Sequence, residues 1–212
     1  MEHTKDTLLQ ELARSVQDIR VLTAIERVPR DLFVPPDKRK LAYANMALPI
    51  GKRQTISQPL MVALMTEAAA LGPEDKVLEV GTGSGYQAAV LAHLAREVIT
   101  VERIPELRSR ARSLLRSLGY ENVWVYAALD DTLGFPPAAP YDAILVTAAA
   151  PNVSDVLWEQ LKEGGRLVIP VGFETEQQLA QVTKVNGEKV VRWLGACRFV
   201  PLIGRDAWSE EQ

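Results

Sequence analysis

Apolar residues recur at helical spacing in the first part of the chain and in short strand-like runs after it. Residues 5–28 carry apolar side chains three and four positions apart, which predicts one or two amphipathic helices ending at Pro29. Residues 29–56 contain several prolines and show no clear period. A further helix of about fourteen residues is predicted from Ser57, with Gly72-Pro73 after its end.

From Lys76 onward, strand and helix patterns alternate. The predicted strands are 76–80, 98–102, 122–126, 141–147 and 166–171, and the predicted helices are 85–95, 105–118 and 153–162. Alternating units of this length imply a parallel sheet with helices on both faces. Asn186-Gly187 then separates two strand patterns, 179–185 and 189–194, which indicates a β-hairpin.

The pattern therefore predicts the α/β class, with a Rossmann-like, doubly wound sheet that is mostly parallel and carries a C-terminal antiparallel hairpin strand. Residues 1–72 are expected to form an N-terminal helical extension, packed on a core of residues 73–212 as one structural unit. A ligand of such a sheet binds outside the carboxyl ends of the strands, where the strand order reverses.

Composition excludes several functional classes. A net charge of −3 gives no electrostatic case for a nucleic-acid partner. The single cysteine, Cys197, leaves no internal disulfide or cysteine metal cluster, and fits a reducing compartment. The first twenty residues are rich in charge, and no apolar run reaches the ~18 residues of a membrane span. We expect a cytoplasmic, monomeric protein with no metal and no membrane partner.

Three alternate glycines, Gly81, Gly83 and Gly85, lie between the predicted strand 76–80 and a helix. Unpaired backbone N–H groups at a helix N-terminus bind nucleotide-like ligands. Tyr86 stands where the dinucleotide fingerprint requires its third glycine, which disfavours a dehydrogenase, and the lysine of a phosphate-binding loop is missing. Glu102 ends the next predicted strand, where a carboxylate can accept two ribose hydroxyl groups. The turn, preceded by Glu79, resembles the S-adenosylmethionine turn of class I methyltransferases.

Motifs along nearly the whole chain resemble the protein-L-isoaspartate O-methyltransferase family. The most specific is Thr55-Ile56-Ser57-Gln58-Pro59, since methyltransferases in general lack it. That motif belongs to the matching segment 54–59, and the further matching segments are 27–35, 42–45, 47–51, 79–87, 101–103, 140–144, 147–151, 160–172 and 198–202.

The resemblance implies protein repair with S-adenosylmethionine as methyl donor and S-adenosylhomocysteine as product. The family methylates the free α-carboxylate of isoaspartyl residues in damaged proteins and peptides, and the ester then cyclises without enzyme and reopens partly as normal Asp. By position Ser57 is the catalytic serine, expected to hydrogen-bond the substrate carboxylate. The resemblance and the turn together give these expected cofactor-binding residues: Gln54, Thr55, Ile56, Ser57, Glu79, Gly81, Thr82, Gly83, Ser84, Gly85, Glu102, Arg103, Ala128, Leu129 and Asp130.

Two of these residues also have a purely structural interpretation. A serine just before an apolar helical run is typical of a helix N-cap, so Ser57 could cap the helix as well as act on substrate. Glu79 could be a partner of a helix dipole instead of a cofactor contact.

One departure from the family pattern affects the adenine site. The family usually has Gly-Asp-Gly after the third strand, where the Asp helps to bind the adenine edge, and this chain has Ala128-Leu129-Asp130. Asp130 could substitute after a slip of one residue. This departure keeps open the alternative of a cofactor-binding protein with weakened catalysis. A methyltransferase whose acceptor is a peptide natural product or small molecule is a further alternative.

Overall fold

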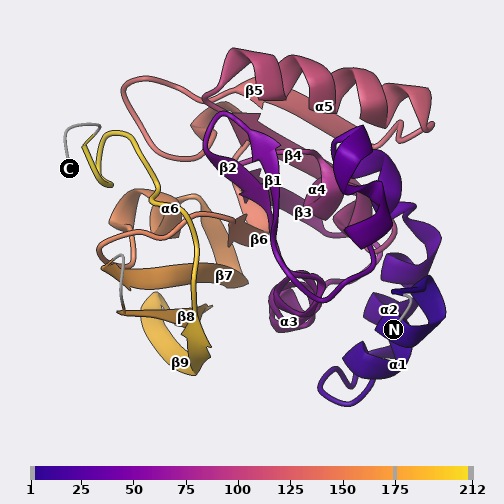
Figure 1. The fold of residues 1–212 in the computed structure, drawn as a ribbon. Coiled ribbons are helices and arrows are strands. Elements are labelled where there is room, and N and C mark those ends of the chain that lie inside the picture. Colours follow the sequence, from indigo (N-terminus) through magenta and orange to yellow (C-terminus); the bar gives the residue numbers. More distant parts are fainter. Residues whose placement is uncertain (1–2, 174–175, 210–212) are drawn as a thin grey trace.

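A seven-stranded sheet in the order β5-β4-β3-β6-β7-β8-β9 forms the centre of the protein (Figure 1). The structure is a computed structural model and describes residues 3–173 and 176–209. Strands β3 to β7 run parallel, whereas β8 is antiparallel to both β7 and β9. The strands are β3 (Lys76–Val80), β4 (Glu97–Glu102), β5 (Val123–Ala127), β6 (Tyr141–Val146), β7 (Leu161–Phe173), β8 (Glu176–Val185) and β9 (Glu188–Cys197). The predicted fold class is confirmed.

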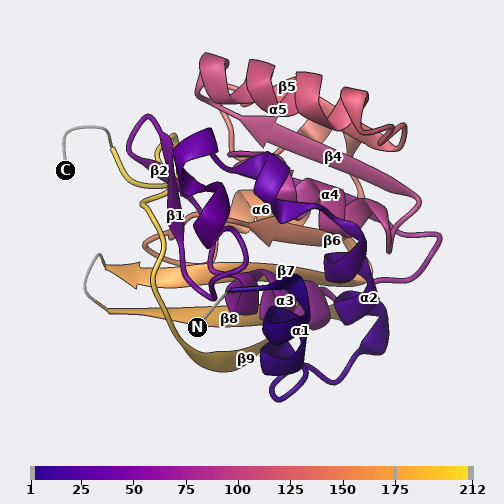
Figure 2. The ribbon, with the colours of Figure 1, turned by 45° about the vertical axis from the view of Figure 1, so that its right-hand side comes forward.

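Helices cover both faces of this sheet. One apolar cluster joins the sheet to α1 (Lys5–Leu12), α2 (Ile19–Arg27), α3 (Pro59–Ala69), α4 (Tyr86–Ala92) and α5 (Pro105–Ser117). Figure 2 looks onto the side that carries α1, α2 and α3. A second cluster on the opposite face contains side chains of α6 (Asp155–Glu159) and of the segment after β9. Leu8 and Leu12, near the N-terminus, belong to the first cluster, so the N-terminal segment shares the core of the sheet.

The N-terminal helical pattern resolves into two helices because each has its own cap. The side chain of Thr4 accepts a hydrogen bond from the Thr7 backbone N–H and caps the start of α1. The side chain of Asp18 accepts one from the Arg20 backbone N–H and caps the start of α2. Glu67 of α3 holds the connection, since its Oε1 accepts from the backbone N–H groups of Gln17 and Asp18 at 2.6 and 2.7 Å.

Residues 29–56, which show no period, contain short elements that position the site. These are the 3-10 helices η1 (Arg30–Phe33) and η2 (Pro36–Leu41) and the hairpin strands β1 (Leu48–Gly51) and β2 (Gln54–Ile56). The hairpin turns at Lys52 and Arg53, with φ of +54° and +57°. Tight hairpins need two positive φ values, usually at Asn and Gly, so Lys-Arg gives no turn signal.

Around α6 the structure differs from the predicted helix 153–162. The helix begins after the cap Ser154 and ends at Glu159, and β7 already starts at Leu161. A short 3-10 helix, η3 (Pro136–Ala138), precedes β6. None of the helices in the described ranges is long and apolar enough to span a membrane.

Candidate active site

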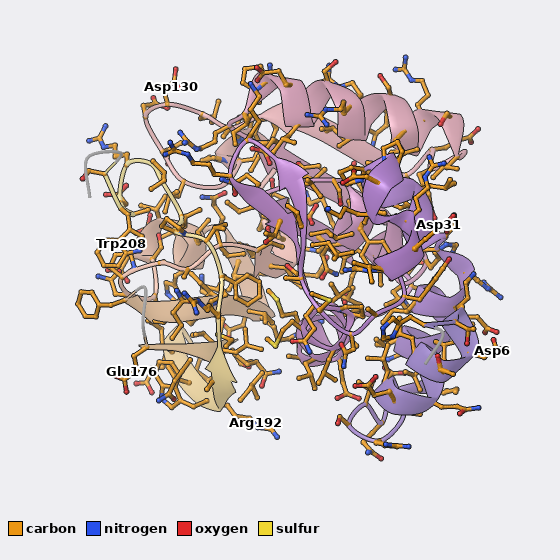
Figure 3. The ribbon with its side chains drawn as sticks, viewed as in Figure 1. Asp6, Asp31, Asp130, Glu176, Arg192 and Trp208 are labelled. Atoms are coloured by element: carbon orange, nitrogen blue, oxygen red, sulfur yellow. The ribbon has the colours of Figure 1, made fainter. Side chains whose placement is uncertain are left out.

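A pocket of about 420 Å³ opens at the carboxyl ends of β3, β4 and β6. This is where the strand order reverses, because β4 and β5 lie on one side of β3 and β6 lies on the other. Its walls come from β2, the glycine turn, the loop after β5 and the segment after β9. Figure 3 labels Asp130 and Trp208, which belong to two of these walls.

The structure brings the expected cofactor residues to this one pocket, with a single exception. All of them line it except Gly85. Gly85 has φ of +89° and is the N-cap of α4, and a Cβ there would lie 3.1 Å from Leu115 and 3.4 Å from Ala111 of α5. This glycine therefore allows α4 and α5 to pack closely.

Gly81 brings the backbone of the turn against β6. Its φ is +102°, and a Cβ would lie only 2.4 Å from Thr147 Oγ1. That hydroxyl group donates to the carbonyl oxygens of Gly81 and Val80 at 2.6 and 3.1 Å. Thr147 thus locks the turn to the end of β6, and our sequence reasoning did not assign it to the site.

Glu102 is oriented by the backbone on both sides of the pocket. Its side chain is 6% exposed, and its two carboxylate oxygens accept from the N–H groups of Gly83 and Ile104 at 2.8 and 2.9 Å. Each oxygen keeps further lone-pair capacity, so the carboxylate is held ready for two hydroxyl donors.

Glu79 lies deeper than Glu102 and is completely buried. Thr100 Oγ1 donates to its Oε2 at 2.5 Å, and Thr82 Oγ1 lies 2.6 Å from Thr100 Oγ1. Burial is the largest cause that raises the pKa of Glu79 to about 8; Thr100 opposes the shift, and the nearby charge of Glu102 adds to it. Its hydrogen bond comes from a threonine hydroxyl group, not from a helix N-terminus.

Ser57 lies on the pocket wall immediately before α3. The N-cap of α3 is Gln58, whose side chain makes no capping bond, and Asn45 Oδ1 accepts from the Leu60 N–H at 3.0 Å instead. The side chain of Ser57 is therefore not the helix cap. Its carbonyl oxygen accepts from Arg30 Nη2 at 2.7 Å.

Arg30 is fully buried and ties three segments together. Besides Ser57, it donates from Nε to the Ala42 carbonyl at 2.8 Å, and its guanidinium carbon lies 4.7 Å from the centre of the Tyr86 ring. The loop that carries Ser57 is thereby fixed to the start of α4.

In the loop after β5, Leu129 lines the pocket and is 37% exposed. Asp130 also lines the pocket and is also exposed, and Figure 3 shows it at the outer edge of its loop. The loop is anchored further along, where Gln160 Oε1 accepts from the Phe135 N–H and Gln160 Nε2 donates to the Leu133 carbonyl, both at 2.9 Å.

The wall formed by the segment after β9 was not predicted from the sequence. Leu202 donates its N–H to the Ala149 carbonyl at 2.8 Å, and Trp208 Nε1 donates to the same oxygen at 3.1 Å. The Trp208 ring packs against Phe173, with ring centres 5.6 Å apart. The only indication of this wall in the sequence was segment 198–202, which resembles the family but carries no residue typical of catalysis.

Comparisons with known proteins agree with this geometry. The family model described as protein-L-isoaspartate(D-aspartate) O-methyltransferase matches residues 3–207. A protein-L-isoaspartate O-methyltransferase of Dictyoglomus turgidum is 52% identical over 195 residues, covering 92% of this chain and 88% of that protein.

Two solved structures share the whole fold. A protein-L-isoaspartate O-methyltransferase has a TM-score of 0.84 at 28% identity, covering 96% of this chain and 67% of the other. A Plasmodium falciparum protein described as a beta-aspartate methyltransferase, in complex with S-adenosyl-L-homocysteine, has a TM-score of 0.79 at 26% identity, covering 92% of this chain and 95% of the other. The chain therefore belongs to the protein-L-isoaspartate(D-aspartate) O-methyltransferase family.

Proposed function

We propose that the protein transfers a methyl group from S-adenosylmethionine to the α-carboxylate of L-isoaspartyl residues in damaged proteins and peptides. The observation that carries this proposal is the meeting of Ser57 and the Gly81–Gly83 turn in one pocket. The cofactor supplies a methyl carbon activated by its positively charged sulfur. The acceptor carboxylate is already ionised at neutral pH and needs no general base.

The residues present fit the adenosine part of this cofactor. Glu102 is pre-oriented by two backbone N–H groups, which supports a role as acceptor for the ribose hydroxyl groups. Gly81 lets the backbone approach without a side chain in the way. Leu129 offers an apolar surface for the adenine ring, and the exposed Asp130 takes no part in our proposal for the adenine edge.

Ser57 has the position of a residue that orients the acceptor. In this proposal its hydroxyl group donates a hydrogen bond to the substrate carboxylate, while Arg30 fixes its backbone through the carbonyl oxygen. Holding the carboxylate in line with the methyl group is the main catalytic contribution, since orientation can supply roughly 7–11 kcal/mol of barrier reduction. His93 takes no part, because it lines a separate hollow with Tyr120.

The expected partners are isoaspartyl-containing proteins and peptides. The alternative of a shifted acceptor is not favoured, because relatives about half identical along nearly the full chain are protein-L-isoaspartate O-methyltransferases. A monomer that acts in the cytoplasm without nucleic acid remains part of the proposal, and the net charge of −3 supports the absence of a nucleic-acid partner. Light scattering during size-exclusion chromatography would test the oligomeric state.

The deciding experiment compares radiolabelled methyl transfer to an isoaspartyl peptide with transfer to its normal Asp isomer. We expect labelling of the isoaspartyl peptide and almost none of the isomer. Equal labelling of both peptides, or labelling of neither at saturating cofactor, would contradict the proposed function.

A further inference from the structure

One oxygen of the buried carboxyl group of Glu79 has no hydrogen-bond donor. The side chain is 0% exposed, Oε2 accepts from Thr100, and Oε1 lacks a partner among the described residues. An ionised carboxylate without full hydrogen bonding is expensive to bury, whereas the neutral, protonated form costs much less. Glu79 therefore carries its proton when the pocket holds no ligand.

The groups packed around Glu79 favour the same neutral state. Glu102, at the end of β4, places a second carboxylate near Glu79. On β6, the residue paired with Glu79 in the sheet is the apolar Leu145. The buried guanidinium group of Arg30 donates to backbone carbonyl oxygens instead. The buried polar side chains of α3 and α4 are uncharged, namely Thr66 and Gln87.

The protonated state persists at neutral pH, because burial raises the pKa of Glu79 to about 8. A positive charge that enters the same low-dielectric pocket favours the ionised form and lowers that pKa. S-adenosylmethionine brings such a charge, since its ammonium and sulfonium groups outweigh its one carboxylate. S-adenosylhomocysteine has lost the sulfonium charge and is neutral overall.

We propose that Glu79 releases its proton to solvent when S-adenosylmethionine binds, and that this coupling makes the pocket prefer the charged cofactor to its product. The inference rests on the proposed function, because it takes S-adenosylmethionine as the ligand. Methyl transfer removes the sulfonium charge, so the proton returns to Glu79 and the product is held less tightly. Glu79 thus determines cofactor selectivity by its charge.

Proton release can be counted by titration calorimetry in two buffers with different ionisation enthalpies. The probes are S-adenosylmethionine, sinefungin (which carries an amine in place of the sulfonium group) and S-adenosylhomocysteine. Relative to Glu79→Gln, we expect the unmodified protein to release about one additional proton with each cationic probe at pH 7, and much less with S-adenosylhomocysteine. The difference should vanish above about pH 9, where Glu79 is already ionised.

Three variants test whether Glu79 is the group that releases the proton. Glu79→Gln should lower the ratio of S-adenosylmethionine to S-adenosylhomocysteine affinity about tenfold at pH 7, the effect of lowering the pKa of Glu79 from about 8 by roughly two units. Thr100→Val removes the hydroxyl group that stabilises the ionised form, so proton release should persist to higher pH. Asp131→Asn removes an exposed carboxylate of the loop after β5, outside the pocket, and should release as many protons as the unmodified protein.

The outcomes separate this inference from the proposed function. Normal cofactor binding with equal proton counts in the unmodified protein and Glu79→Gln overturns the inference and leaves the function intact. Failure of the unmodified protein to bind either S-adenosyl compound overturns the function. Should Glu79→Gln not fold, the pH profiles decide: release that is independent of pH, or unchanged in Thr100→Val, overturns the inference.

Discussion

Replacing Gly81 by alanine should damage both stability and cofactor binding, because the new methyl group would collide with Thr147. The Cβ atom would lie 2.4 Å from Thr147 Oγ1, at a residue whose φ is +102°. Backbone strain of this kind costs about 1–3 kcal/mol. The Thr147 hydroxyl group has one hydrogen to donate, so pushing it off its carbonyl acceptors costs about 1 kcal/mol. The expected loss of unfolding free energy is about 2–4 kcal/mol in total.

Gly119→Ala provides the matched control. Gly119 also has a positive φ, +79°, but a Cβ there would meet no atom within 4 Å. It should therefore show the strain alone, with unchanged binding of S-adenosylhomocysteine, whereas Gly81→Ala should weaken that binding at least ~10-fold, or about 1.4 kcal/mol. Urea denaturation and calorimetry measure the two quantities.

A Thr147→Ala background tests the collision directly. Once Oγ1 is gone, the nearest atom to the new methyl group is the Cβ of residue 147, at an ordinary distance of 3.7 Å. Adding Gly81→Ala to this background should then cost no more than Gly119→Ala. The reasoning is wrong if the Thr147→Ala background leaves the cost of Gly81→Ala undiminished, or if Gly81→Ala alone is as mild as the control.

Three further changes probe the rest of the pocket. Ser57→Ala should lower turnover ~10-fold or more with unchanged S-adenosylhomocysteine affinity, since one hydrogen bond to a charged group is lost; unchanged turnover in a destabilised variant would assign Ser57 a structural role. Glu102→Ala should weaken S-adenosylhomocysteine binding several-fold and also lower the unfolding free energy, because two backbone N–H groups lose their acceptor; calorimetry showing full affinity in the folded variant would remove Glu102 from the site. The double change Ala128→Gly with Leu129→Asp should tighten S-adenosylhomocysteine binding by giving the adenine amino group an acceptor. Unchanged or weaker binding would show that the loop binds adenine in another way.

The parallel strands were predictable because they read as nearly continuous apolar runs, and β3, β4 and β6 are buried on both faces. β3 spans Lys76–Val80, as the pattern predicts, and β4 and β5 agree within one residue at each end. The hairpin β8–β9 was predictable for another reason, since Asn186-Gly187 supplies both positive φ values of its turn.

Elements that depend on distant contacts could not be predicted in the same way. The hairpin β1–β2 turns at Lys52-Arg53, two residues with no preference for positive φ. Its tip lies against α5, where Lys52 forms an ion pair with Glu106. The segment after β9 folds back because Trp208 donates to Ala149, a pairing that no local pattern encodes.

The residues of the site show the same difference between local spacing, which could be predicted, and distant contacts, which could not. Gly81 and Glu102 could be placed at the pocket from the sequence, because spacing within the strand–turn–helix–strand unit alone locates both residues. The partners that hold these residues in place were not found, because they arrive from other strands. Thr147 fixes the glycine turn from the end of β6, and Thr100 on β4 orients Glu79.

The position of Ser57 also depends on a contact from a distant residue, Arg30. Composition alone would place Arg30 on the surface, since arginine is almost never fully buried unless paired. Instead it is buried, donating to the carbonyl oxygens of Ala42 and Ser57 and covering the Tyr86 ring at the start of α4. Because α4 begins directly after the glycine turn, this one guanidinium group connects the segment that carries Ser57 to the turn for the cofactor. A reaction that depends on alignment requires those two parts to keep a fixed relation, and the N-terminal segment provides it.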